Sequence, residues 1–366
     1  MPIEEILAEI VENGASDIFI VAGRPLSYKA HGQIVERTLF ENDKEVSAPK
    51  LTPADTDNYI SQIYSLASDR NMERLRVCGD DDFSFALRGV ARFRINAYKQ
   101  RGSLSAVIRV ITFTIPKPEV MGIPEKIIEF ADKKKGLVLI TGPAGSGKST
   151  TLACMIDHIN STRQSHIITL EDPLEYLHMH KNSIVSQREV VTDTESYLTA
   201  LRASLRQSPD VILLGEMRDY ETMNVAMTAA ETGHLILSTL HTIGASNTID
   251  RIIDAFPPNQ QHQIAIQLSM VLQAVVSQQL VPGVDGKIIP AFEIMTLTPA
   301  IRSMIRDSKV HQIDGMIYSS AADDMIAMDT SLLNLYKEKR ITEKTALTYA
   351  TNPELLQKKI NMLPKW

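Results

Sequence analysis

Cysteine is scarce in this chain of 366 residues, which contains only Cys78 and Cys154. The two lie far apart in the sequence and form no Cys-x-x-Cys pair, the spacing that is typical of zinc ribbons. A disulfide framework would need a denser set of cysteines. We therefore expect neither a structural zinc site nor a fold stabilised by disulfides.

Long apolar runs are missing as well. The sequence has no stretch of about 18 uncharged apolar residues, so no transmembrane helix is expected. Residues 1–16 are acidic and amphipathic, and they lack the basic segment and apolar stretch of a secretory signal. We expect a cytoplasmic protein whose association with a membrane, if it has one, is peripheral.

Basic residues are not in excess, because 38 Lys and Arg stand against 44 Asp and Glu and give a net charge of −6. Proteins that coat nucleic acid need a surplus of cations, so no nucleic-acid partner is expected. The composition, 44% hydrophobic and 22% charged, is that of an ordinary globular protein. At this length, two domains are the default expectation.

What the sequence does contain is a phosphate-binding loop. Residues 142–149 read Gly-Pro-Ala-Gly-Ser-Gly-Lys-Ser, and they follow a buried-strand pattern at 136–140 and precede a helix. The glycines let the backbone form a concave nest of N–H groups, and the helix start adds positive potential. Lys148 is placed to reach the β- and γ-phosphates, and the Ser149 hydroxyl to ligate Mg²⁺. The predicted nucleotide-binding residues are Gly142, Pro143, Ala144, Gly145, Ser146, Gly147, Lys148, Ser149 and Thr150.

Strands and helices alternate after this loop. Short apolar runs separated by helical patterns are typical of a parallel sheet covered on both faces, so the fold class is α/β. The expected strands are 137–141, 166–170, 211–214 and 235–240, and the expected helices are 148–160, 195–207 and 219–232. Beyond residue 255 we expect mostly helix, with one short strand near 288–294.

The chain before the loop has a different character. It predicts a smaller α+β domain over residues 1–114, followed by a Pro-rich linker at 115–122 and the nucleotide-binding domain at 123–366. Within the first domain, the alternation at 82–98 around Arg88-Gly89 predicts an antiparallel hairpin. Helices are expected at 2–13 and 59–76, and further strands at 17–21 and 104–112.

Acidic residues follow two of the expected strands. Glu171 and Asp172 end the second strand, and Glu216 follows the third. Ligands bind at the carboxyl ends of strands in open α/β sheets, where a carboxylate can orient the attacking water or hold Mg²⁺ through water. The alternative is that each is a solvated acid at a strand end.

Two histidines bracket the fourth strand, with His234 before it and His241 after it. Either could hydrogen-bond a γ-phosphate, although a lone histidine is more often structural. By its position at the strand end expected to face the nucleotide, His241 is the stronger candidate.

Four segments in this order resemble the secretion and pilus motor ATPases. They are GPAGSGKST, TLEDPLEYLH, SLRQSPDVILLGEMRD and TAAETGHLILSTLHT. The resemblance extends over almost the whole chain and is narrower to the type IV pilus retraction ATPases of that superfamily. It implies a homohexamer that hydrolyses ATP with Mg²⁺, each subunit having a PAS-like N-terminal domain and a RecA-like domain.

The same resemblance assigns roles to individual residues. It implies that Lys148 and Ser149 belong to Walker A, Glu171 and Asp172 to the Asp box, and Glu216 to Walker B. His234 and His241 would form the His box. Two arginines of the N-terminal domain, matched here by Arg94 and Arg109, would stabilise the transferring γ-phosphoryl group.

The resemblance also implies a partner, an inner-membrane platform protein of the pilus. Residues 300–307, AIRSMIRD, resemble the AIRNLIRE element of the retraction branch but depart from it at Ser303, Met304 and Asp307. A motor of a related secretion system is the closest alternative. A nucleic-acid translocase or a nucleotide-gated switch that barely hydrolyses ATP are more distant ones.

Overall fold

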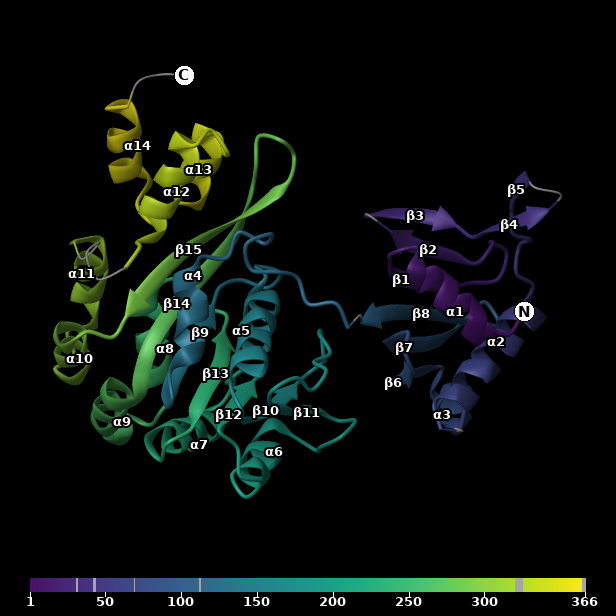
Figure 1. The fold of residues 1–366 in the computed structure, drawn as a ribbon, viewed down its shortest axis with the longest axis horizontal. Helices are drawn as coiled ribbons and strands as arrows, with labels where there is room; N and C mark the ends of the chain where they lie inside the picture. The colour runs from purple at the N-terminus through teal and green to yellow at the C-terminus, as the bar shows by residue number, and fades with distance from the viewer. Residues whose placement is uncertain (31, 42–43, 69, 112, 320–324, 364–366) are drawn as a thin grey trace. The chain divides into compact units, whose positions relative to one another are not determined.

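The computed structural model describes residues 1–366 except 31, 42–43, 69, 112, 320–324 and 364–366 (Figure 1). Two compact units make up the chain. The N-terminal unit comprises Met1–Thr114 and Glu175–Leu177, and the C-terminal unit comprises Ile115–Leu174 and His178–Trp366. None of the helices in the described residues is long and apolar enough to cross a membrane.

The N-terminal unit is built on a six-stranded antiparallel sheet in the order β3-β2-β1-β8-β7-β6. Apolar residues of α1 and α2 share one core with the strands. The strands of this sheet are β1 (Ala15–Ile20), β2 (Ser27–Ala30), β3 (Gln33–Glu36), β6 (Asp80–Leu87), β7 (Ala91–Gln100) and β8 (Ser103–Ile111). The remaining elements are α1 (Ile3–Glu12), α2 (Pro53–Leu66), α3 (Glu73–Cys78) and the small hairpin of β4 (Thr38–Glu41) and β5 (Lys44–Ser47).

The predicted hairpin is confirmed, because β6 and β7 pair around Arg88 and Gly89. The single helix expected at 59–76 is wrong. Helix α2 starts earlier, at a capping box formed by Thr52 and Asp55, and ends at Leu66. Ser68 has a φ of +57°, a left-handed backbone that no right-handed helix can include, and α3 starts afresh beyond it.

A buried carboxylate joins the helices of this unit to its sheet. The Asp81 side chain on β6 is fully buried and accepts hydrogen bonds from Arg70 at 3.0 Å and from Tyr64 at 2.9 Å. Burial alone would raise the pKa of Asp81, but these bonds outweigh it and hold the pKa below its ordinary value. The bonds position the segment after α2 against the sheet.

The C-terminal unit contains a seven-stranded sheet in the order β11-β10-β12-β13-β9-β14-β15, in which only β15 is antiparallel to its neighbour. The strands are β9 (Gly136–Thr141), β10 (His166–Glu171), β11 (Ile184–Glu189), β12 (Val211–Leu214), β13 (Leu235–Leu240), β14 (Leu272–Pro282) and β15 (Ile288–Thr296). The helices before β14 are α4 (Glu125–Glu129), α5 (Lys148–Thr162), α6 (Tyr197–Ser204), α7 (Tyr220–Glu231), α8 (Ala245–Asp254) and α9 (Pro258–Val271). Those after β15 are α10 (Pro299–Arg306), α11 (Ile313–Ser319), α12 (Met328–Lys337), α13 (Glu343–Tyr349) and α14 (Pro353–Asn361), and two short 3₁₀ turns are η1 (Phe130–Asp132) and η2 (Val310–Gln312).

Helices cover both faces of this sheet, as Figure 1 shows. Along β9, Leu137 and Leu139 pack into a core with α6 to α11, whereas Val138 and Ile140 pack into a second core with α4 and α5. All six residues of β9 are buried. This explains the continuous apolar run in the sequence, since a strand covered on both sides needs an apolar side chain at every position. The α/β fold with a smaller α+β part before it is confirmed.

The expectation of mostly helix beyond residue 255 missed a long strand. Strand β14 runs for 11 residues, Leu272–Pro282, and pairs with β9 on one side and with β15 on the other. Glutamines and a serine interrupt its apolar residues, and eight of its eleven residues, polar ones among them, are buried. Neither period 2 nor period 3.6 therefore stands out in the sequence.

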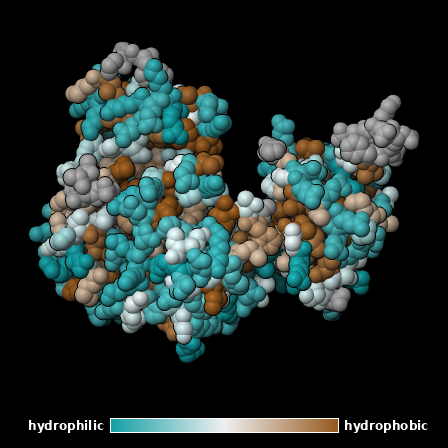
Figure 2. All heavy atoms as spheres, viewed as in Figure 1, coloured by the Kyte–Doolittle hydropathy of each residue, from teal (hydrophilic) through white to brown (hydrophobic). Residues whose placement is uncertain are grey.

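The hairpin of β14 and β15 extends beyond the other strands to the last helices, as Figure 1 shows. There Val281, Ile289 and Ala291 form a separate core with α12, α13 and α14. On the visible face in Figure 2, hydrophilic and hydrophobic residues are interspersed over both units.

Candidate functional site

The predicted phosphate loop connects β9 to α5 at the carboxyl edge of the sheet. Gly142, Gly145 and Gly147 have φ values of +141°, +76° and +85°, which a residue with a side chain rarely adopts. Helix α5 begins at Lys148, with Ser149 and Thr150 in its first turn. The backbone thus curls into a concave loop that opens onto a helix N-terminus, the geometry that binds phosphate.

Gln278 on β14 packs against this loop, and the sequence analysis missed it. A Cβ on Gly142 would lie 2.2 Å from the backbone carbonyl oxygen of Gln278. A Cβ on Gly147 would lie 2.9 Å from the side-chain nitrogen Nε2 of the same residue. The same side chain accepts a hydrogen bond of 2.8 Å from Thr151 on α5. Gly142 is therefore required by close packing against the backbone of β14 as well as by its φ value, whereas at Gly147 the close contact is with the end of a side chain.

The side chain of Lys148 folds back onto the loop and is held there by carbonyl groups of the loop backbone. The ammonium donates to the carbonyl oxygens of Gly142 and Pro143, each at 2.9 Å, and only 8% of the residue is exposed. In the same loop the Ser146 hydroxyl is buried without a hydrogen-bond partner. A buried polar atom without a partner is costly, and a phosphate oxygen bound in the loop would supply one.

His241 connects the phosphate loop to the acid after β12. Its Nδ1 lies 3.5 Å from Nζ of Lys148, and its Nε2 lies 3.5 Å from a carboxylate oxygen of Glu216. Glu216 is mostly buried, with 14% of its side chain exposed, and it also forms an ion pair with Arg218. Side chains from the start of α5 and from the ends of β13 and β12 therefore meet in one chain of contacts.

Glu171 lies at the end of β10, where Gln187 of β11 donates to its carboxylate at 3.5 Å. A tyrosine that the sequence analysis missed, Tyr197 at the start of α6, lies close to these acids. Burial raises the pKa of its hydroxyl, and the charges of Asp172, Glu216 and Glu171 raise it further. The two predicted acidic strand ends are thus brought into one electrostatic environment around a tyrosine hydroxyl.

The structure separates His234 from this group. His234 precedes β13, and its ring contacts the Ala229 carbonyl oxygen at 2.9 Å. The next residue, Leu235, pairs with Gly136 at the start of β9, whereas Leu240 pairs with Thr141 at its end. His234 is therefore at the opposite edge of the sheet, about 20 Å from His241 for six residues of strand. The sequence analysis placed both in one catalytic group, which a single chain does not form.

The two candidate arginines are cross-strand neighbours in the N-terminal unit, where Arg94 of β7 pairs with Arg109 of β8. Each is held by an acid of an adjacent strand, Arg94 by Asp82 at 2.8 Å and Arg109 by Asp17 at 3.4 Å. Both guanidinium groups thus lie on the same side of the sheet.

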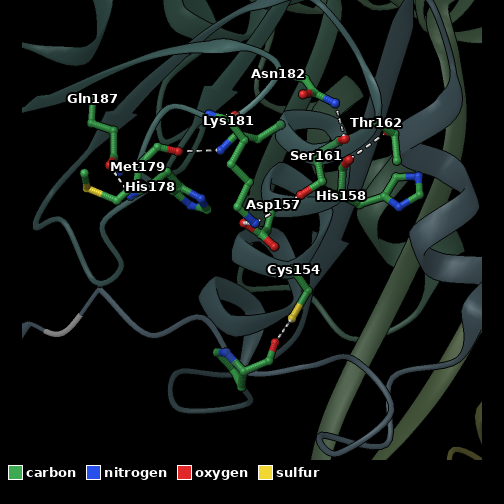
Figure 3. A network of polar contacts seen from close by, with 12 residues as sticks. Cys154, Asp157, His158, Ser161, Thr162, His178, Met179, Lys181, Asn182 and Gln187 are labelled. Atoms are coloured by element: carbon green, nitrogen blue, oxygen red, sulfur yellow. Dashed lines mark hydrogen bonds and ion pairs between the residues drawn. The ribbon is translucent and has the colours of Figure 1, made fainter.

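Helix α5 also binds the segment that follows Asp172. Asn160, which is fully buried, donates to the Met179 carbonyl oxygen at 2.7 Å and accepts from the Lys181 amide at 3.1 Å. Figure 3 shows Lys181 pointing toward Asp157 and Ser161, to which it donates at 2.6 and 3.0 Å. The end of α5 thus fixes residues 178–183, which lead from the acidic strand end into β11.

The residues present suit a magnesium nucleotide. No group of three or more His, Cys, Asp or Glu that could hold a metal ion is found among the residues that the structure describes. Mg²⁺ in phosphate-transfer sites is held mainly by substrate phosphates, waters and one or two protein oxygens, so a dedicated cage is not needed. Ser149, Glu171 and Glu216 are the predicted oxygen donors near the loop.

The loop, the acid after β12 and the parallel sheet define a P-loop protein of the RecA-like α/β class. The profile of the family described as "Type II/IV secretion system protein" matches residues 2–346, and the chain belongs to this family.

Individual relatives cover nearly the whole chain. It is 41% identical to the type IV pilus retraction ATPase PilT of Pseudomonas aeruginosa over 354 residues, which are 97% of this chain and 99% of the relative. It is 39% identical to the type IV pilus ATPase PilU of the same organism over 99% of this chain and 92% of the relative. A crystal structure of the pilus retraction motor PilT with bound ADP matches with a TM-score of 0.85 and 46% identity, covering 98% of this chain and 99% of that one. The predicted resemblance is confirmed.

We expect Gly142→Ala to disrupt the loop, because the new Cβ would overlap a backbone carbonyl of β14 that cannot move away. The free energy of unfolding should fall by about 3 kcal/mol or more, and nucleotide binding should be lost. Gly145→Ala is the matched control. Its Cβ meets nothing within 4 Å, so it should cost only about 1–2 kcal/mol of left-handed strain. Urea denaturation of both variants measures the difference, and equal losses would contradict the packing argument.

We also expect His178 to make stability depend on pH. Burial lowers its pKa to about 4, whereas an unfolded chain binds this proton at about pH 6.5. The contribution of neutral, buried His178 to the free energy of unfolding is therefore fully present above about pH 6.5, and it falls as the pH is lowered toward 4. Between pH 7.5 and 5 the loss should be about 2 kcal/mol.

Urea denaturation of His178→Gln at both pH values tests this. The variant should lose less stability on acidification than the wild type, whatever its stability at pH 7.5. His311→Gln, at an exposed position, is the control. Parallel losses in the wild type and His178→Gln would show that His178 is not responsible.

Proposed function

We propose that this chain is a motor ATPase that couples the hydrolysis of Mg-ATP to retraction of a type IV pilus. The observation that carries the proposal is the contact chain from Lys148 through His241 to Glu216. It connects Lys148, which would bind the terminal phosphate, to Glu216, which would orient the attacking water. Loss of the phosphate would therefore change the contacts of both residues. The relatives named as pilus ATPases, which align over nearly the full length, support the cargo.

In the proposed reaction, Lys148 binds the β- and γ-phosphates and Ser149 supplies an oxygen to Mg²⁺. Glu216 accepts a hydrogen bond from the attacking water and orients it in line with the γ-phosphorus. Glu171 assists from the neighbouring strand end. His241 donates to a γ-phosphate oxygen and, on the other side of its ring, stays beside Glu216.

Arg94 and Arg109 complete the proposed site from an N-terminal unit. Guanidinium groups stabilise charge on the transferring phosphoryl group, and the two lie next to each other on adjacent strands. ATP and ADP would then favour different arrangements of the two units, because only ATP offers a γ-phosphate to the arginines. The domain boundaries proposed here are 1–114 and 123–366, with the segment 115–122 between them as the hinge.

The proposed assembly is a homohexamer in the cytoplasm that works on an inner-membrane platform protein of the pilus. Homologous motors named for pilus retraction support this partner. A secretion-system motor remains the nearest alternative, because the family includes proteins of type II and type IV secretion.

Glu216→Gln should lower ATP turnover by about 10²-fold or more while leaving ATP binding intact, because the amide cannot accept the proton of the attacking water. Steady-state Mg²⁺-dependent turnover, nucleotide affinity and mass by light scattering would be measured together. Glu231→Gln, an exposed acid at the end of α7 near the opposite sheet edge, is the control. A hexamer-sized wild-type particle is expected. Unchanged turnover in Glu216→Gln would exclude its role, and a monomer without turnover would count against a motor.

Arg94→Ala and Arg109→Ala should each reduce turnover by about 10²-fold or more, since the guanidinium acts on charge that develops in the transition state. Each should also reduce the preference for ATP over ADP, because the arginine contacts the γ-phosphate. Arg101→Ala is the control, because Arg101 is exposed in the turn after β7. Should Arg94→Ala and Arg109→Ala behave like Arg101→Ala, the arginines serve only their ion pairs with Asp82 and Asp17.

A further inference from the structure

A cavity of about 820 Å³ lies within the C-terminal unit, outside the phosphate site. Its walls come from segments distant in sequence: the loop into α8, strands β14 and β15, helix α11, the start of α12 and the segment between α13 and α14. This volume is in the range that holds small organic ligands.

The charge of the lining is of one sign. Glu293, Asp314 and Asp329 face the cavity, and none of its described lining residues is Lys, Arg or His. Glu293 and Asp329 are 7% and 5% exposed, so water screens them poorly. Negative charge therefore collects in a partly enclosed space.

Glu293 and Asp329 also have structural roles. Glu293 accepts a hydrogen bond of 2.8 Å from the Ala245 amide at the start of α8, and Asp329 accepts from the amides of Thr351 and Asn352 before α14. At Glu293 this hydrogen bond does not offset the cost of burying the charged carboxylate. The pKa of Glu293 is still raised, by burial first and also by Asp314 and Asp329.

The rest of the lining is apolar or aromatic. Ile243, Met328 and Leu355 contribute aliphatic side chains, and Tyr318 and Tyr349 contribute rings. The Tyr318 ring already has one cation beside it, because Lys359 donates to the Tyr318 hydroxyl and its Nζ lies 4.1 Å from the ring centre. Aromatic rings and carboxylates together are the features that recognise organic ammonium groups.

We propose that this cavity binds a small organic cation, an ammonium or guanidinium group carried on an apolar or aromatic body. The charged group lies among Glu293, Asp314 and Asp329, and the body packs against the aliphatic and tyrosine side chains. The bound molecule contacts Ile243 and Gly244, which follow His241 by only two and three residues. The binding itself does not depend on the proposed ATPase function.

Tryptamine and its neutral analogue tryptophol, in which a hydroxyl replaces the amine, test the proposal on the full chain without nucleotide. Isothermal titration at low salt should show one tryptamine per chain with a Kd on the order of 0.1–1 mM. Tryptophol should bind at least about tenfold more weakly, because it has no charge to interact with the carboxylates.

Asp314→Asn is the informative variant, because Asp314 is exposed and its loss should not impair folding. It should weaken tryptamine binding about fivefold and leave tryptophol unchanged, and Asp314→Lys should weaken it further. Asp285→Asn, an exposed acid outside the cavity, should have no effect. The proposal is overturned if tryptophol binds as well as tryptamine, if Asp314→Asn binds like the wild type, or if no saturable binding occurs.

Discussion

The parallel pairing of β9 on both of its sides is the constraint on which the rest of the C-terminal unit depends. Strand β9 lies between β13 and β14 in the sheet and pairs with both, and it is buried on both faces. Because the three strands run in the same direction, their carboxyl ends meet at one edge. The register of these strands is enough to bring together the phosphate loop, His241 and Gln278, independently of the side-chain contacts within the site.

Much of this could be predicted from the sequence because the signals are local. The phosphate loop requires glycines at fixed spacing, and a strand covered on both faces requires an unbroken apolar run, so both appear in a few consecutive residues. The acids at Glu171 and Glu216 follow from the same logic, since each comes directly after such a run. These predictions needed no knowledge of which strands are neighbours.

The residues that were missed owe their roles to distant neighbours. Gln278 supports the loop from a strand that is 127 residues away from its partner Thr151, and Tyr197 meets acids from two other strand ends. Neither has a local signature, because a buried glutamine in a strand and a tyrosine at a helix start are common for other reasons. His234 is the reverse case. The resemblance to the motor ATPases assigned it to the site together with His241, but the six-residue strand between them places the two histidines at opposite ends of the strand.

Helix α5 has a further consequence, because its two ends belong to different parts of the site. Its first turn completes the phosphate loop, and its last turns hold residues 178–183 through Asn160. With 15 residues it is about 22 Å long, so a tilt of about 10° at the nucleotide end displaces the other end by roughly 4 Å. Because α5 is joined to the phosphate loop at one end and to residues 178–183 at the other, a small tilt at the nucleotide would displace residues 178–183.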